Sequence, residues 1–339
     1  HTFGVVLCQS AYKSKGNQLG GSRWHLVNVN KPSIDYATGN LDLSTDADGN
    51  ITGGTVEYSV YGGPYTIHTL SSLFGRLSYN YDEKYMIQAT VRRDGSSRFG
   101  ANNKYGVFPS VSLGWNVTNE NFMEDRPEWF DALKVRASWG KNGSDNIADF
   151  GYTSLTAMGN NVLFGKTATK YNGSKAQRLA NPDLRWEKTA QLDVGIDYSF
   201  FNGRLRGTVE YYNKRTTDLL YDYDVPVPPY QYSSMMANVG ETSNTGFEVT
   251  IAGTPVIAGD FRWDASFNFA HNRNVLVSMS NEKYSREQVY LGAYSISGIA
   301  ETTMILEAGK PLGTFYGAKC LGVDEDGMLL YEDVNKDGK

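Results

Sequence analysis

Apolar and polar side chains alternate along most of this chain, most clearly between residues 70 and 99. On both sides of a short polar turn at residues 82–84, every second position carries an apolar, aromatic or small residue: Leu73, Gly75, Leu77, Tyr79, Tyr81, Tyr85, Ile87, Ala89 and Val91. A period of two is the signature of a β-strand with two unlike faces. The segment is predicted to be a β-hairpin with one apolar face and one mostly polar face.

The same alternation recurs at residues 3–7, 111–117, 133–139, 190–198, 205–211, 247–251 and 261–269. With the hairpin, these segments predict about ten strands. Residues 23–61 are either a long loop or an extra hairpin, because turn signals lie at residues 46–49 and 53–54. No further strand pattern follows Phe269, so the predicted sheet is an open arc.

Short and long connections alternate between these strands. The links at residues 82–84, 202–203 and 258–260 are tight, whereas 94–105, 141–185 and 217–238 are long. Such alternation is typical of outer-membrane barrels, which have short periplasmic turns and long extracellular loops. The segment 118–132 is longer than a periplasmic turn should be, and we expect a short amphipathic helix from Glu120 to Leu133.

The strand lengths and the composition both favour a membrane-spanning barrel. A tilted strand crosses a bilayer with about 9–11 residues, and aromatic residues gather where the apolar band ends. Hydrophobic residues make up only 40%, mean hydropathy is -0.44 and Tyr (23) outnumbers Phe (15). No run approaches the roughly 18 apolar residues of a spanning helix. The predicted fold is therefore an all-β, antiparallel transmembrane β-barrel.

Charge and cysteines exclude other classes. The net charge is -5, with no basic block that would neutralise phosphates, so nucleic acid is not expected as a partner. Cys8 and Cys320 lie far apart without metal or redox spacing, and we favour two buried thiols over one bridge.

The sequence contains little that points to catalysis. The four histidines are scattered, and the stretch from Gly159 to Thr167 has five residues between its glycines where a phosphate loop has four. Asp193 and Asp197 lie on one strand and are interpreted as hydrated wall residues, not as a glycosidase pair. We expect no enzymatic activity and no required cofactor.

Asp333, Asn335 and Asp337, followed by Gly338, match the first half of a calcium-binding loop. The closing Glu is not present in this sequence. A structural calcium site and an acidic turn that only solvates a loop are equally compatible with the pattern.

Aromatic residues in the long connections are the candidates for contact with a cargo, because each offers a flat apolar face and a polar group. They are Trp24, Tyr221, Tyr223, Tyr230 and Tyr232. Loop packing or an interfacial aromatic girdle would explain them equally well. Arg92, Arg93 and Arg98 are expected to brace the rim of the barrel.

Several motifs resemble one family. Residues 79–85 (YNYDEKY) and 89–99 (ATVRRDGSSRF), together with 108–115 (FPSVSLGW), 133–143 (LKVRASWGKNG), 181–188 (NPDLRWEK), 244–248 (NTGFE) and 313–317 (GTFYG), resemble SusC/RagA-type TonB-dependent transporters of Bacteroidetes. The similarity covers residues 66–339 well and residues 1–65 only loosely.

The resemblance implies a barrel of roughly 22 strands with a plug domain, placed in the bacterial outer membrane. It implies import of a bulky oligosaccharide or oligopeptide, with a SusD-like surface lipoprotein and the TonB complex as partners. Residues 1–339 are then expected to be part of the barrel wall in contact with lipid, an interior piece without the plug and the C-terminal strands. The alternatives are a secreted β-sandwich that binds or cleaves glycans, and a passive porin or adhesin barrel.

Overall fold

The computed structural model describes residues 1–22, 40–48, 51–57, 59–62, 66–164, 169–225, 234–281, 285–296 and 299–332. The chain divides into two compact units, one formed by His1–Ser10 with Ser71–Lys339 and the other by Ala11–Leu70. Within the described residues, no helix is long and apolar enough to cross a membrane.

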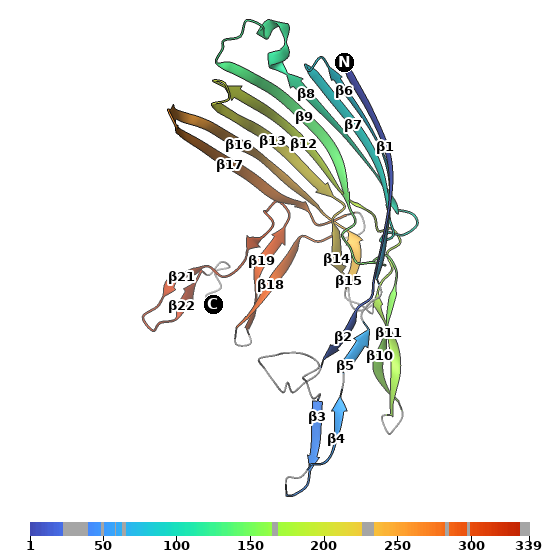
Figure 1. Ribbon diagram of the computed structural model, residues 1–339. Helices are drawn as coiled ribbons and strands as arrows, with labels where there is room; N and C mark the ends of the chain where they lie inside the picture. Colours follow the sequence, from blue (N-terminus) through green and yellow to red (C-terminus); the bar gives the residue numbers. More distant parts are fainter. Residues whose placement is uncertain are drawn as a thin grey trace. The chain divides into compact units, whose positions relative to one another are not determined.

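A single large sheet carries the first unit, and its strands lie side by side in Figure 1. Nine strands of the described chain form it, in the order β1-β6-β7-β8-β9-β12-β13-β16-β17. Their bounds are β1 (Thr2–Gly16), β6 (Thr66–Tyr81), β7 (Tyr85–Ser96), β8 (Tyr105–Asn116), β9 (Phe130–Ser144), β12 (Glu187–Phe200), β13 (Leu205–Thr217), β16 (Glu241–Ala258) and β17 (Phe261–Ser278). Strands β1 and β17 are its edges, so the predicted open arc of antiparallel strands is confirmed.

Register places like residues next to one another across the sheet. Ile196 pairs with Val209, Val209 with Val249, and Val249 with Phe269, so an apolar row crosses the strands from β12 to β17. The alternate positions, such as Asp197, form polar rows on the opposite side. We call these two sides the apolar face and the polar face. Large apolar side chains on the apolar face are exposed, for example Phe267 at 59%.

The two ends of the sheet differ. Tight turns occupy one end, which we call the turn end, and they use left-handed backbone at Asp82 (φ 52), Glu83 (φ 55), Phe201 (φ 59) and Asn202 (φ 56). At the opposite end, the loop end, the long connections contain short antiparallel hairpins. These are β10 (Leu155–Phe164) with β11 (Thr169–Arg178), and β14 (Leu220–Asp224) with β15 (Ser234–Asn238).

The chain beyond β17 forms further small sheets. These comprise β18 (Gln288–Ile296), β19 (Ile299–Glu307) and β20 (Thr314–Phe315) in one sheet, and β21 (Cys320–Val323) with β22 (Leu329–Tyr331) in another. Both thiols are free, Cys8 half-buried and Cys320 exposed. The expected burial is wrong for Cys320, which is exposed on β21; among the described residues β21 pairs only with β22.

The second unit contains two short strand pairs. Strand β2 (Leu19–Ser22) pairs with β5 (Ser59–Gly62), and β3 (Asn40–Thr45) pairs with β4 (Ile51–Glu57). Of the two predictions left open for residues 23–61, the extra hairpin agrees with the described part of this segment. The ring of Tyr12 also packs edge-on against that of His68, with centroids 6.0 Å apart.

The connection from β8 to β9 does not contain the expected α-helix. Two 3-10 turns, η2 (Val117–Asn119) and η3 (Asn121–Met123), are followed by β9 from Phe130. Glu120 separates the two turns and accepts hydrogen bonds from the Tyr85 hydroxyl and from Trp115 Nε1 (3.0 Å). The Tyr85 bond, followed by that of Trp115, lowers the pKa of Glu120. A helix from Glu120 to Leu133 is not formed because its second half is taken up by β9, in which Phe130 pairs with Phe200 of β12, and Pro127 precedes that strand.

Candidate functional site at the loop end

Burial in this chain is concentrated at the loop end. Within the described residues, the buried hydrophobic side chains are Phe99, Phe108, Val117, Ile147, Leu184, Trp186, Met235, Ala237, Val239, Leu276, Val289 and Ile305. Val117 lies at the turn end, and the others lie at the loop end or in the hairpins beyond it. The loop end therefore has a small packed core, to which Phe108 of β8 and Leu276 of β17 contribute, whereas the middle of the sheet has none among the described residues.

An aromatic cluster forms the first part of this core. The indole of Trp186 lies 5.2 Å from the ring of Phe99 and 5.5 Å from that of Phe108, measured between ring centroids. Trp186 Nε1 donates a hydrogen bond to the backbone oxygen of Lys104 (3.1 Å), and Leu184 is fully buried nearby in the chain. The cluster fixes the connection between β7 and β8 to the segment that leads into β12.

Polar and charged contacts at the loop end of β7 link the β7–β8 connection to the β9–β10 connection. Arg92 Nε lies 2.7 Å from both carboxylate oxygens of Asp94. Buried Ser96 donates to Asp145 (2.6 Å), and Arg98 Nε donates to Asp149 (2.9 Å). Arg92 and Arg98 thus make the rim contacts expected of them, whereas Arg93 lies over the ring of Tyr105 at 4.0 Å.

Asn238 joins the segment that leads into β12 to the connection between β13 and β14. Its side chain accepts a hydrogen bond from the Arg185 backbone N–H (2.9 Å) and donates to the backbone oxygens of Arg185 (2.7 Å) and Asp218 (2.9 Å). Arg185 also forms an ion pair with the Asp218 carboxylate at 2.6 Å. Burial opposes ionisation of Asp218, but the bonds and charges of Arg185 and Lys188 prevail and lower its pKa.

A cavity of about 260 Å³ lies between the β14–β15 hairpin, β17 and the segment that follows β17. Tyr221 and Tyr223 both line it, together with buried Leu276 and Val289. The guanidinium of Arg286 lies 5.6 Å from the centre of the Tyr223 ring and forms an ion pair with Asp224 at 2.8 Å. The cavity thus combines apolar walls, two phenols and one cation, a set that suits a ligand with both apolar and polar groups.

On the polar face of the sheet, side chains of neighbouring strands are joined by ion pairs and hydrogen bonds. Arg136 bridges Asp197 (3.3 Å) and Glu210 (2.8 Å) across three strands. Asp193 accepts from Ser138 (3.3 Å) and Gln191 (2.8 Å). Asp193 and Asp197 are therefore held by separate donors, which agrees with their interpretation as wall residues.

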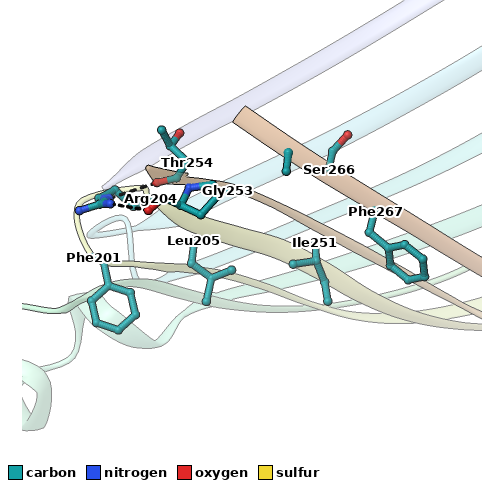
Figure 2. A pocket seen from close by; sticks show the side chains of 10 residues that line it. Phe201, Arg204, Leu205, Ile251, Gly253, Thr254, Ser266 and Phe267 are labelled. Carbon is teal, nitrogen blue, oxygen red and sulfur yellow. Dashed lines mark hydrogen bonds between the residues drawn. The ribbon is translucent and has the colours of Figure 1, made fainter. Parts of the chain in front are cut away.

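A second cavity, of about 520 Å³, opens on the apolar face at the turn end (Figure 2). Phe201, Leu205, Ile251 and Phe267 line it. At its edge Arg204 donates to the backbone oxygens of Thr254 (3.2 Å) and Pro255 (3.0 Å), so its polar group is engaged by the β16 bulge. Because this cavity lies on the apolar face, it is not a candidate for a hydrophilic cargo.

Of the aromatic residues selected from the sequence, the structure brings Tyr221 and Tyr223 together. Trp24, Tyr230 and Tyr232 lie outside the described residues, as do the calcium-loop candidates Asp333, Asn335 and Asp337. Sequence reasoning did not find Asn238 or Arg286. No local pattern marks either residue, because their roles depend on partners more than 40 residues away in the chain, such as Arg185 and Asp224.

Comparison with known proteins places these features in one family. The family described as "TonB dependent receptor-like, beta-barrel" matches residues 9–324. TonB-dependent receptor P39 of Formosa agariphila is 40% identical over 259 residues, which is 76% of this chain and 23% of that protein. TonB-dependent receptor SusC of Bacteroides thetaiotaomicron is 35% identical over 252 residues, covering 74% of this chain and 25% of that protein.

A solved structure of the RagAB peptide transporter superposes with a TM-score of 0.75 at 25% identity, over 97% of this chain and 33% of the transporter chain. The chain thus spans about a quarter of the length of these sequence relatives and a third of the structural one.

Proposed function

The chain belongs to the TonB-dependent receptor family, whose β-barrel domain it matches, and on this premise we propose that it forms part of the wall of an outer-membrane importer. The apolar face then contacts lipid and the polar face lines the lumen. The tight turns lie on the periplasmic side and the loop end is extracellular, as in other outer-membrane barrels. Transport requires binding and gating, and the chain performs no bond chemistry.

The observation that carries this proposal is the different chemistry of the two faces of one sheet. On the apolar face, exposed aromatic and aliphatic residues continue across paired strands. On the polar face, charged residues such as Arg136 are held in hydrogen-bonded pairs. A soluble β-sandwich would cover its apolar faces with a second sheet, whereas here a single sheet leaves them exposed.

The cargo is proposed to be a bulky hydrophilic solute, either an oligopeptide or an oligosaccharide. The oligopeptide alternative is supported by the similarity to a peptide transporter. The oligosaccharide alternative rests on the SusC/RagA-type resemblance. In either case the full-length receptor is proposed to work with a SusD-like lipoprotein outside and with the TonB complex inside, and Tyr221 and Tyr223 are proposed to contact cargo at the extracellular cavity.

Growth of the native bacterium tests this proposal. A strain that lacks the receptor should fail on a subset of oligopeptides or oligosaccharides supplied as the sole nitrogen or carbon source, and the wild-type gene should restore growth. In the deletion strain, the gene for the Tyr221→Ala/Tyr223→Ala receptor should restore growth less well than the gene for the Tyr211→Ala receptor. The Tyr211→Ala receptor is the control because it loses a phenol from the apolar face. Normal growth of the deletion strain on every source, or an equal defect in both variants, would contradict the proposal.

The partner is tested separately by purification. Affinity capture of the full-length receptor from outer membranes should recover a surface lipoprotein in a fixed ratio. Recovery of the receptor alone, under conditions that keep it folded, would favour a passive barrel.

A further inference from the structure

We propose that the loop-end cavity between the β14–β15 hairpin, β17 and the β18–β19 pair is a specificity pocket that takes one apolar side chain of an oligopeptide cargo. The proposal rests on the importer function proposed above, and it selects the peptide from the two classes of cargo left open there. Eight of the thirteen residues that line the cavity are leucine, valine or methionine. Its walls are therefore mainly aliphatic.

The cavity lies on the polar face of the sheet. The polar row that starts at Asp197 reaches Asn268 on β17, and Leu276 lies an even number of residues beyond it, so its side chain points to the same face. Thr242 pairs directly with Leu276 from β16, and both line the cavity. In the proposed importer this face lines the lumen, so the cavity lies on the path of a cargo.

The size of the cavity fits one side chain. Val239, Leu276 and Val289 are buried at its walls, whereas Tyr221 and Leu312 are exposed at its rim. A cavity of about 150 Å³ already accepts benzene, and pockets for whole drug-sized ligands begin at roughly 300 Å³. At about 260 Å³, this cavity has room for one large apolar side chain but not for several linked sugar rings.

Most polar groups around the cavity are already paired. The Tyr223 hydroxyl donates to the backbone oxygen of Ser285 (3.1 Å), and the Ser278 hydroxyl donates to a backbone oxygen two residues further along the chain (3.2 Å). Within the described residues, only the hydroxyls of Tyr221 and Thr242 lack a partner among the lining groups. Two hydroxyls cannot pair all those of a sugar ring, and a polar group buried without a partner weakens binding. An apolar side chain has no such requirement, and the Tyr221 hydroxyl can donate to the peptide carbonyl beside it.

Strand β18 has a second feature that suits a peptide. It contributes Val289 to the cavity, and within the described residues it pairs with β19 and with no other strand. Its other edge is therefore open to pairing. An extended peptide adds to such an edge through main-chain hydrogen bonds while alternate side chains enter neighbouring pockets. A glycan has no main-chain donors and acceptors at that spacing.

Contacts of Arg286 hold the mouth of the cavity in place. Its guanidinium pairs with Asp224 at 2.8 Å and lies over the ring of Tyr223. Its backbone N–H donates to the Ser280 hydroxyl (3.0 Å), which in turn donates to the backbone oxygen of Arg286 (3.2 Å). Walls that the chain's own groups fix leave little ordering for a cargo to provide. Because Asp224 neutralises Arg286, the pocket selects for an apolar side chain and not for a charge.

The test measures which peptides the purified full-length receptor retains in detergent, by mass spectrometry. The probe is a synthetic octapeptide library whose central position carries phenylalanine, leucine, serine or glutamate in equal amounts. Its other positions carry only glycine, alanine, serine, aspartate and lysine. We expect peptides with central phenylalanine or leucine to be enriched at least about tenfold over those with serine, because burial of a large apolar side chain favours binding to that degree.

Two variants locate this preference. Leu312→Asp places a charge at the rim of the cavity, where the native side chain is exposed, and should abolish the preference. Leu329→Asp changes an exposed leucine on β22 that does not line the cavity, and it should retain the preference.

The proposal is overturned if the wild-type receptor retains the four peptide sets equally or retains none, if Leu312→Asp keeps the preference, or if both variants lose it. Binding of maltohexaose that Leu312→Asp abolishes and Leu329→Asp retains would assign the cavity to a glycan and overturn it as well. The wild-type comparison needs no variant, so it remains decisive if Leu312→Asp fails to fold. Failure of the importer proposal looks different: the deletion strain would then grow normally on every source, whereas failure of the pocket alone leaves the growth defect in place.

Discussion

The strand wall and the loop end of this protein are stabilised in different ways. In the wall, long strands pair side by side while large side chains on the apolar face stay exposed, as Phe267 at 59% and Leu113 at 51% illustrate. At the loop end, shorter segments bury Trp186 at 5% and Leu184 at 0%. The wall depends on backbone hydrogen bonds and on its surroundings, whereas the loop end carries its own core. Single side chains should therefore matter most at the loop end.

The largest expected effect comes from Trp186→Ala. Removing a buried indole from its cluster with Phe99 and Phe108 should lower the free energy of unfolding by about 3–5 kcal/mol, measured by denaturant titration of the full-length receptor in detergent. The matched control is Trp139→Ala, since Trp139 is 39% exposed on the apolar face. Equal losses for the two variants would contradict the contrast between loop end and wall.

A smaller effect is expected for Asn238→Ala. The variant removes three partly buried hydrogen bonds to Arg185 and Asp218 and leaves their backbone groups without these partners, so we expect a loss of about 2 kcal/mol. Limited proteolysis should also cut the connections at residues 179–186 and 218–225 faster. Asn213→Ala on the exposed apolar face is the control, and faster cleavage in that variant as well would show that the loops are not held by Asn238.

Arg136→Gln should cost less, although it breaks contacts with both Asp197 and Glu210. The Arg136 side chain is 34% exposed on the polar face, and water screens such pairs, so about 1 kcal/mol or less is expected. Unfolding of the full-length receptor in detergent is again the measurement. A loss as large as that of Trp186→Ala would show that the wall also depends on single side chains.

The smallest effect is a pH dependence at Asp218. Its pKa is lowered in the folded protein, so its contribution to stability is present above the unfolded value of about 3.9. That contribution is lost as the pH falls through the folded pKa. The difference in melting temperature between wild type and Asp218→Asn should therefore shrink between neutral pH and about pH 3. A constant difference over this range would mean that the ion pair with Arg185 does not stabilise the loop end.

The sequence predicted the wall better than the loop end for a physical reason. A strand with two unlike faces repeats every two residues, so positions such as Ile87 and Val209 report their own face. The expected helix from Glu120 to Leu133 was wrong because Phe130 and Leu133 belong to strand β9 and pair with the distant β12, and Pro127 disfavours a helix before them. Tyr221 and Tyr223 were selected as loop aromatics, and the sequence carried no sign that they would share a cavity with Arg286.

The sequence by itself determined the all-β class, the strand faces, the alternation of short and long connections and the family. These follow from local periodicity and from motifs that are contiguous in the chain. Only the tertiary structure decided which connections pack together and where the core lies. Such features depend on strand register and on contacts between distant segments, such as Asn238 with Arg185, and no local pattern encodes them.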